Sequence, residues 1–289
     1  MRVGVIIPTY NRKAALLRAI QSVLANATFP RNHQPIDLEI IIVDDGSTDG
    51  TRDLAAGAYG AMKIQYLHQP NRGPATARNL GILQTSAEFI AFLDSDDEWL
   101  PGKLAVQLQY FEENPDCLIC QTEEIWVRHG QRVNPMKKHK KYGGWIFEKC
   151  LPLCVVSPSA VMMRRKFFDD VGLFDESFLA CEDYDLWLRA SARFPIGLIE
   201  KPYVVKYGGQ ADQQSRKFPA MDRFRIRAIQ KILDSGILKG EPREAALEEL
   251  KRKCEIVSRG ALKRGRIEEA ERYCVIAKSL APAGNTASQ

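Results

Sequence analysis

Residues 88–97 have the sequence EFIAFLDSDD, in which an apolar run is followed at once by three carboxylates, Asp94, Asp96 and Asp97. A short apolar run of this kind predicts a buried strand over Glu88–Leu93. Like charges this close together repel each other unless a cation or hydrogen bonds offset them. Carboxylate oxygens suit Mg²⁺ and Mn²⁺, which share their coordination shell with substrate phosphates. The stretch therefore predicts a divalent metal site, with a solvated acidic turn as the alternative.

Three other apolar stretches of the first hundred residues also end in polar clusters. Strands are predicted over Val3–Pro8, Leu38–Val43 and Ile64–His68, and residues at helical spacing lie between them. This alternation predicts an α/β fold with a mostly parallel central sheet flanked by helices. Ligands of such sheets bind beyond the carboxyl ends of the strands. We therefore expect a ligand site at one edge of the sheet, built from Thr9–Arg12, Asp44–Ser47, Gln69–Gly73 and Asp94–Asp97.

The second half of the chain has a less regular pattern. Its predicted elements are a helix over Pro101–Asn114, a strand over Cys117–Val127, a strand over Pro158–Met163, a helix over Glu182–Arg193 and two short strands within 196–207, broken at Pro202. From Phe218 onward every periodic stretch is helical, and residues 259–271 resemble half of a tetratricopeptide repeat. One such unit cannot bury its own apolar face, so we expect it to pack on the rest of the chain or on a partner. A disordered tail is expected over 282–289.

The composition is that of an ordinary globular protein, with 45% hydrophobic and 27% charged residues and no apolar run long enough to span a bilayer. The N-terminal apolar stretch is too short for a signal peptide, and seven scattered cysteines do not form a disulfide framework. Buried core thiols are the favoured interpretation of the Cys117/Cys120 pair, ahead of a metal site. A cytoplasmic location is expected. The basic run 137–141 is interpreted as a solvated loop or as a contact with anionic lipid or phosphate.

Two common phosphate-binding motifs are absent from the sequence. No GxGxxG follows the first strand, and no GxxxxGK[ST] occurs. Phosphate recognition would then come from a metal, from basic side chains and from a helix N-terminus. The stretch Gly73–Arg78 is predicted to open a helix whose free amides could face an anion, with Arg72 and Arg78 close by.

Five stretches, in this order and spacing, resemble the family 2 glycosyltransferases, which are inverting enzymes of the GT-A fold. They are Pro8–Arg12, Val43–Asp49, Asn71–Gly73 with Ala77–Ile82, Phe92–Asp97, and Glu182–Asp183. The resemblance covers roughly residues 1 to 210. It implies a catalytic domain over 1–215, with a nucleotide-sugar-binding half over 1–100 and an acceptor-binding half over 101–215. A helical extension would occupy 216–289.

The resemblance also assigns roles to individual residues. Pro8 and Tyr10 would lie under the base and ribose, Asp45, together with Asp44, would bond the nucleobase, and Arg72 and Arg78 would border the nucleotide. Asp96 would lie against the ribose and the metal shell, and Asp97 would be the direct ligand of Mn²⁺ or Mg²⁺. The resemblance assigns Asp94 no fixed role, because the position of this residue varies among family members. Asp183 would be the general base, with Glu182 beside it; the alternative for Asp183 is a helix N-terminal residue favoured by the dipole.

The resemblance implies transfer of a sugar from a nucleotide-diphosphate sugar, with UDP as the expected nucleotide, to an acceptor hydroxyl with inversion, in cell-surface polysaccharide or glycoconjugate synthesis. The acceptor would be a carbohydrate or a lipid-linked molecule, reached in the cytoplasm or at the inner face of the membrane. No nucleic acid is expected as a partner, while the C-terminal helices are expected to bind a protein partner or a second copy. The alternatives are a catalytically silent nucleotide-sugar-binding protein and a sugar nucleotidyltransferase.

The sequence departs from the family at one position. Members often carry a histidine near the end of the catalytic unit that helps to bind diphosphate or metal, and the corresponding stretch 207–215 contains none. Gln210, Gln213 or Arg216 are the expected replacements.

Overall fold

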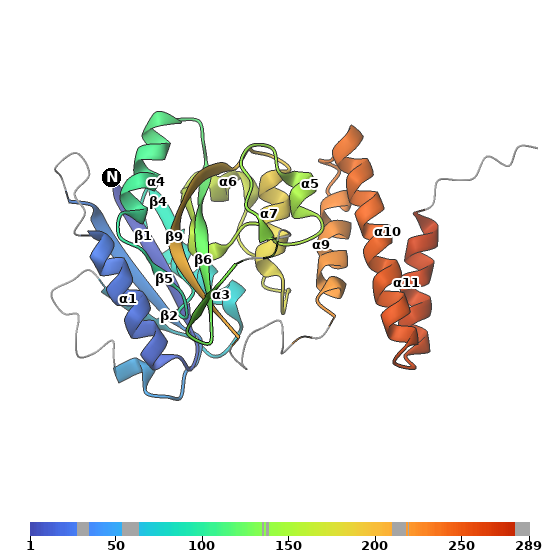
Figure 1. Cartoon of the computed structure of the whole chain (residues 1–289), viewed down its shortest axis with the longest axis horizontal. Helices are drawn as coiled ribbons and strands as arrows, with labels where there is room; N and C mark the ends of the chain where they lie inside the picture. Colours follow the sequence, from blue (N-terminus) through green and yellow to red (C-terminus); the bar gives the residue numbers. More distant parts are fainter. Residues whose placement is uncertain are drawn as a thin grey trace, which may run out of the picture.

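The computed structural model describes residues 1–27, 35–53, 64–134, 136, 139–209, 218 and 220–280. Over these residues the chain forms a curled sheet with helices on both faces, followed by three C-terminal helices (Figure 1). The strands are β1 (Arg2–Thr9), β2 (Asp37–Asp44), β3 (Ile64–His68), β4 (Phe89–Phe92), β5 (Glu98–Trp99), β6 (Ile119–Arg128), β7 (Gln131–Val133), β8 (Val161–Arg164) and β9 (Gly197–Gly208).

The helices alternate with these strands in the first half and dominate the end of the chain. They are α1 (Lys13–Ala27), α3 (Pro74–Gln84), α4 (Lys103–Glu113), α5 (Phe147–Cys150), α6 (Phe167–Val171), α7 (Glu182–Ser191), α9 (Asp222–Asp234), α10 (Gly240–Leu262) and α11 (Ile267–Ser279), with a 3₁₀ turn, η2, at Pro158–Ala160.

The parallel half of the sheet follows the sequence prediction. Its strands run in the order β3-β2-β1-β4, with every pair parallel. Alternate residues of β1 enter different cores: Val5 and Ile7 pack with α1 and α4, while Ile6 packs with α3 on the other face. Gly81 lets α3 approach closely, because a Cβ at this position would lie 2.5 Å from Ile6 Cγ2. Burial on both faces explains why these strands are continuous apolar runs.

The other half of the sheet is mixed, so the sheet as a whole is less parallel than expected. Strand β8 is antiparallel to both β4 and β6, and β5 is antiparallel to β9. The reason lies in η2, where Ser159 Oγ accepts a hydrogen bond from the Asp94 amide at 3.1 Å. The chain thus enters β8 at the edge where β4 ends and has to run back along β4.

Two element predictions in this half were wrong in detail. The residues Pro158–Ala160 form a 3₁₀ turn, and only Val161–Arg164 are extended. Residues 197–208 form one strand, not two, because the register of β6 against β9 shifts at Glu123, opposite Pro202. An irregularity in the pairing accommodates a proline, which has no N–H to donate. Strand β5, two residues long, was not predicted.

Several predicted features lie partly or wholly outside the described residues. The stretch between β2 and β3, where residues at helical spacing were expected, is described as far as Asp53, and the basic run lacks 137 and 138. The stretch 210–217 and the tail 282–289 are outside as well. All seven cysteines are free, and Cys120 is fully buried, which agrees with core thiols.

The C-terminal helices pack on the sheet-containing unit. This is one of the two arrangements expected from the sequence, the other being packing on a partner. Helix α9 lies against α7, and α10 lies between α9 and α11 (Figure 1). Lys253 of α10 is 1% exposed and donates hydrogen bonds to the Pro152 carbonyl at 2.9 Å and to Asp222 at 3.0 Å. None of the helices in the described part of the chain is long and apolar enough to cross a membrane.

Candidate active site

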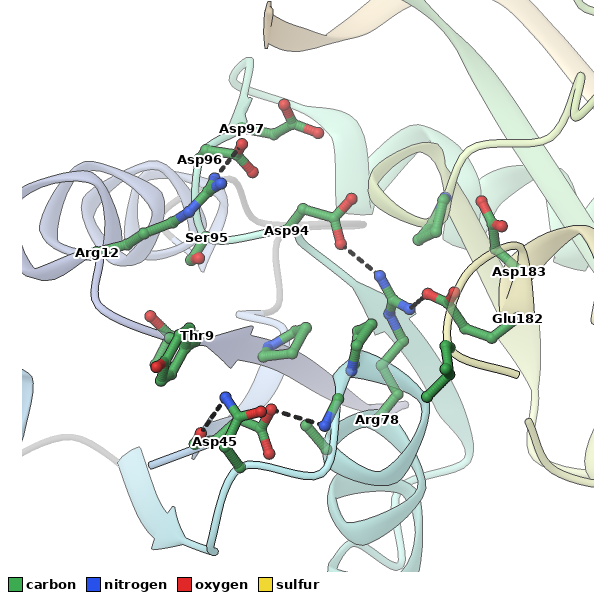
Figure 2. A pocket seen from close by; sticks show the side chains of 18 of the residues that line it. Thr9, Arg12, Asp45, Arg78, Asp94, Ser95, Asp96, Asp97, Glu182 and Asp183 are labelled. Atoms are coloured by element: carbon green, nitrogen blue, oxygen red, sulfur yellow. Dashed lines mark hydrogen bonds and ion pairs between the residues drawn. The ribbon is translucent and has the colours of Figure 1, made fainter. Parts of the chain in front are cut away.

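A cleft of about 1190 Å³ opens at the carboxyl ends of β1, β2 and β4. Its other walls come from the start of α3, from the start of α7, from β9 and from residues around the start of α9. Figure 2 shows Asp45 at the lower left, Asp183 at the right, Asp94 between them, and Asp96 and Asp97 above. The edge predicted from the polar clusters is therefore where the cleft lies.

Asp45 is 5% exposed and organises the loop after β3. Its Oδ1 accepts hydrogen bonds from Gln69 Nε2 at 2.7 Å and from the Arg72 amide at 2.8 Å, and its Oδ2 accepts one from the Gly73 amide at 2.8 Å. A carboxylate has about four lone-pair positions. Three are occupied, so Asp45 keeps one on Oδ2 for a donor in the cleft.

Asp44 has a different position from Asp45. It is fully buried, accepts hydrogen bonds from the Ser47 amide and the Tyr66 hydroxyl, and does not line the cleft. The structure therefore does not bring Asp44 together with the other predicted nucleotide-binding residues. Pro8 and Tyr10 do line the cleft, and Tyr10 is 45% exposed.

Arg78 of α3 is buried between two carboxylates. Its Nη1 donates to Glu182 Oε1 and its Nη2 to Asp94 Oδ1, each at 2.8 Å (Figure 2). Its guanidinium lies over the Phe174 ring. Burial by itself lowers the pKa of Arg78, but the two carboxylates raise it above its usual value. Arg78 thus links β4 to the start of α7. Arg72, the other predicted arginine, is more exposed and pairs with Glu176 at 3.2 Å.

The three clustered aspartates do not converge on one point; each faces a different cation. Asp94 pairs with Arg78 and Asp96 with Arg12 (Figure 2). Asp97 lies 3.9 Å from Lys206 Nζ. Burial by itself raises the pKa of Asp94, but Arg78 and then Lys206 bring it below its usual value. The repulsion anticipated from the sequence is therefore offset within the protein.

Asp97 is the most enclosed of the three, with 2% exposure. Its Oδ2 accepts a hydrogen bond from Ser159 Oγ at 2.6 Å and its Oδ1 one from the Tyr207 amide at 3.3 Å. Burial, opposed by Lys206 and reinforced by the neighbouring carboxylates, raises the pKa of Asp97 to about 8. Burial therefore favours the protonated form of Asp97 unless a further cation lies beside it.

Asp183 lies in the first turn of α7 and lines the far end of the cleft (Figure 2). Its Oδ1 accepts a hydrogen bond from the Tyr184 amide at 2.7 Å, and Cys154 Sγ donates to its Oδ2 at 3.5 Å. Cys181, the residue directly before α7, has a φ of 61°, an unusual conformation for a residue other than glycine. Both the base role and the helix-dipole role predicted for Asp183 are compatible with this geometry.

The donor set for a divalent metal is incomplete within the protein. No three histidine, cysteine, aspartate or glutamate side chains of the described residues are arranged to hold a metal ion. Asp94 Oδ2 and Asp96 Oδ1, however, have no partner among the described residues. Two hard oxygen donors in a cleft fit Mg²⁺ or Mn²⁺, which complete their shell with water and substrate phosphates.

Three residues of the site carried no predicted role. Arg12 pairs with Asp96, Ser159 donates to Asp97, and Lys206 projects from β9 into the cleft. Arg12 belongs to a stretch that was singled out, but its partner could not be read from the sequence. Ser159 and Lys206 lie 62 and 109 residues after Asp97 in sequence, and no local pattern marks them.

Solved structures similar to this chain include residues 1–349 of S. aureus TarS, with a TM-score of 0.69, 20% identity and coverage of 97% of this chain and 80% of that one. The same protein in complex with UDP-GlcNAc gives a TM-score of 0.68 at 19% identity, covering 96% and 91%. At this identity the likeness shows the fold alone, and it agrees with the predicted GT-A fold.

Sequence relatives include a glycosyltransferase of Rickettsia bellii, 35% identical over 69% of this chain. The chain spans 28% of the length of that relative and 32% of that of a Rickettsia conorii one. UDP-Glc:alpha-D-GlcNAc-diphosphoundecaprenol beta-1,3-glucosyltransferase WfgD of Escherichia coli is 29% identical over 76% of this chain and 83% of its own length. Residues 4–172, more than half of the chain, match the family described as glycosyl transferase family 2. The protein belongs to this family.

Proposed function

We propose that the protein transfers a sugar from a UDP-sugar to an acceptor hydroxyl with inversion at the anomeric carbon. The observation that carries this proposal is that one cleft is lined by Asp45, by the acidic residues 94–97 and by Asp183, with Asp94 between Asp45 and Asp183. A nucleotide-sugar presents a base, a diphosphate and an anomeric carbon, with the diphosphate between the other two. The choice of UDP is supported by two similar proteins: TarS, solved in complex with UDP-GlcNAc, and WfgD, whose name gives UDP-Glc as the donor.

At the nucleotide end, the remaining lone pair of Asp45 Oδ2 would accept a hydrogen bond from the base. Pro8 and Tyr10 would lie under the base and ribose, since both line the cleft beside Asp45. Arg72 would border the nucleotide from the loop that Asp45 holds in place. Asp44 would have an indirect role: it accepts a hydrogen bond from the Ser47 amide and so fixes the turn that carries Asp45.

At the other end, Asp183 would accept the proton of the acceptor hydroxyl. The hydroxyl oxygen forms a bond to the anomeric carbon as the bond from that carbon to the diphosphate oxygen breaks, and the electron pair leaves on the diphosphate. A single displacement inverts the configuration. Glu182 would not compete for this role, because it is buried and bonded to Arg78.

A divalent cation would be held at the acidic residues. Asp96, through its unpartnered Oδ1, and Asp97 are the proposed ligands, with the open oxygen of Asp94 beside them. When bound, such a cation stabilises the negative charge that develops on the departing diphosphate. Arg78 would keep Asp94 and Glu182 in place around this region.

The acceptor would enter past Phe178, Leu179 and Met221, which line the cleft beside the start of α7. Leu179 is 65% exposed, so this wall presents apolar surface to solvent. A carbohydrate or lipid-linked acceptor of polysaccharide or glycoconjugate synthesis fits such a wall, and the name of WfgD includes a lipid-linked acceptor. We propose that the reaction takes place in the cytoplasm, at the inner face of the membrane.

The test is release of UDP from UDP-glucose and UDP-GlcNAc by the purified protein with Mn²⁺, with water or added sugars as acceptors. Asp183→Asn should lose turnover at least about 100-fold, as expected for removal of a general base, while keeping UDP affinity. Asp170→Asn is the matched control, because Asp170 is an exposed aspartate of α6.

Two outcomes would contradict the proposal at different points. Full turnover by Asp183→Asn would remove the base assignment. UDP binding without any UDP release by the wild-type protein, across donors and acceptors, would favour the silent binding protein.

A further inference from the structure

Most cations of the cleft are already neutralised by close carboxylates. Arg78 contacts two carboxylates at 2.8 Å, Arg72 contacts Glu176 at 3.2 Å, and Arg12 contacts Asp96. An arginine held in this way has little charge left for a ligand.

Lys206 is the exception among the described residues that line the cleft. Its Nζ donates to Ser157 Oγ at 3.0 Å, and the nearest carboxylate oxygen, Asp97 Oδ2, is at 3.9 Å, beyond hydrogen-bond reach. An ammonium has three N–H donors. Two of them have no acceptor among the described residues, although the side chain is only 27% exposed. A cleft cation with unfilled donors is the arrangement expected of an anion site.

Lys206 lies near both the acidic residues and the proposed base. Its ammonium interacts electrostatically with Asp97, Glu124, Asp94 and Asp183. In a nucleotide-sugar the diphosphate connects the nucleoside to the anomeric carbon. A cleft cation close to both the acidic residues and Asp183 is therefore within reach of the place that the diphosphate would occupy.

We propose that Lys206 binds the diphosphate of the donor and stabilises it as it leaves. The proposal rests on the proposed function in that it takes the ligand to be a nucleoside diphosphate. A compact ammonium suits this role, because it meets a phosphate oxygen as a point charge and needs no planar alignment. Lys206 would thereby contribute, from β9, to the diphosphate binding for which Gln210, Gln213 or Arg216 were the candidates on sequence; those three residues lie outside the described part of the chain.

Affinities for UDP, UMP and uridine, measured by isothermal titration calorimetry in EDTA, test this role. Lys206→Met keeps the aliphatic stem and removes the charge. Its UDP affinity should fall about 10- to 100-fold, the range for loss of a charge-assisted hydrogen bond, while uridine affinity stays unchanged. Lys206→Gln keeps a donor for Ser157 and should show the same selective loss. Lys201→Met is the matched control, since Lys201 is an exposed lysine of the same strand and does not line the cleft.

A purely structural lysine would give a different pattern. If Lys206 only balances Asp97, both variants would melt at lower temperature and would lose UDP and uridine affinity in equal proportion, and the proposal would fall. Unchanged UDP affinity in both variants would also overturn it and leave the proposed function intact. If the wild-type protein binds neither UDP nor uridine, the proposed function itself is wrong.

Discussion

Replacing Arg78 with methionine should destabilise the protein more than any other single change in the cleft. The variant removes the guanidinium that donates at 2.8 Å to both Glu182 and Asp94. Glu182 is 5% exposed, so its carboxylate would be left buried without a cation. Breaking a buried ion pair from one side typically costs about 3–5 kcal/mol. At roughly 2–4 °C per kcal/mol for a domain of this size, the melting temperature should fall by about 6–20 °C.

The pH dependence of this loss separates the electrostatic cause from simple loss of packing. Burial and then Asp183 raise the pKa of Glu182, and Arg78 opposes them. Without Arg78 the pKa of Glu182 rises further. A carboxyl whose folded-state pKa lies above its unfolded value costs stability at neutral pH and ceases to do so as the pH falls below the unfolded value. The stability difference between wild type and Arg78→Met should therefore shrink from pH 7.5 to pH 4.5.

Urea unfolding at several pH values measures this difference, with Arg78→Lys as a second variant. A lysine restores one charge but cannot span two carboxylates, so it should recover only part of the stability. A variant Arg78→Met that unfolds within about 1 kcal/mol of wild type at neutral pH, a surface-type effect, would refute this account. In that case the role predicted for Arg78 from the sequence, a contact with the nucleotide, would be favoured instead.

Three further changes should have measurable effects on stability. Burial lowers the pKa of Lys103 to about 7. Between about pH 7 and the usual lysine pKa, the folded protein therefore binds fewer protons than the unfolded chain, and the free energy of unfolding should rise with pH. The slope of this rise should be smaller in Lys103→Met. Gly81→Ala should cost about 1–3 kcal/mol in urea unfolding, because the new Cβ would lie 2.5 Å from Ile6 Cγ2. Lys253→Met should lower the melting temperature and make 222–280 more sensitive to limited proteolysis, because it removes the bond from α10 to the Pro152 carbonyl; equal sensitivity to wild type would contradict this.

Sequence alone was sufficient for the parallel half of the sheet and for the edge at which the site lies. Strands β1, β2 and β4 are buried on both faces, so their apolar runs are continuous and end abruptly at polar residues. Such patterns involve only neighbouring residues, so they can be recognised in a single sequence. The order of strands then brings Asp45 and Asp94–Asp97 to one edge without further information.

The elements that were missed depend on partners far away in the chain. Strand β5 has only two residues, Glu98 and Trp99, and exists because β9 pairs with them across about 100 residues. The single strand β9 needs the matching shift in β6 to accommodate Pro202. Likewise, Lys206 becomes a cleft residue only through the pairing of β9, and nothing in its neighbours along the chain indicates this.

The proposed metal site has a different basis in the structure from the one inferred from the sequence. On sequence, a cation was invoked because Asp94, Asp96 and Asp97 repel one another. In the fold that repulsion is offset by Arg78, Arg12 and Lys206, which come from three different elements. The acidic residues therefore need no metal in order to fold in this arrangement. What supports a metal is instead the pair of carboxylate oxygens that these cations leave open, on Asp94 and Asp96, at the place where a diphosphate would complete the shell.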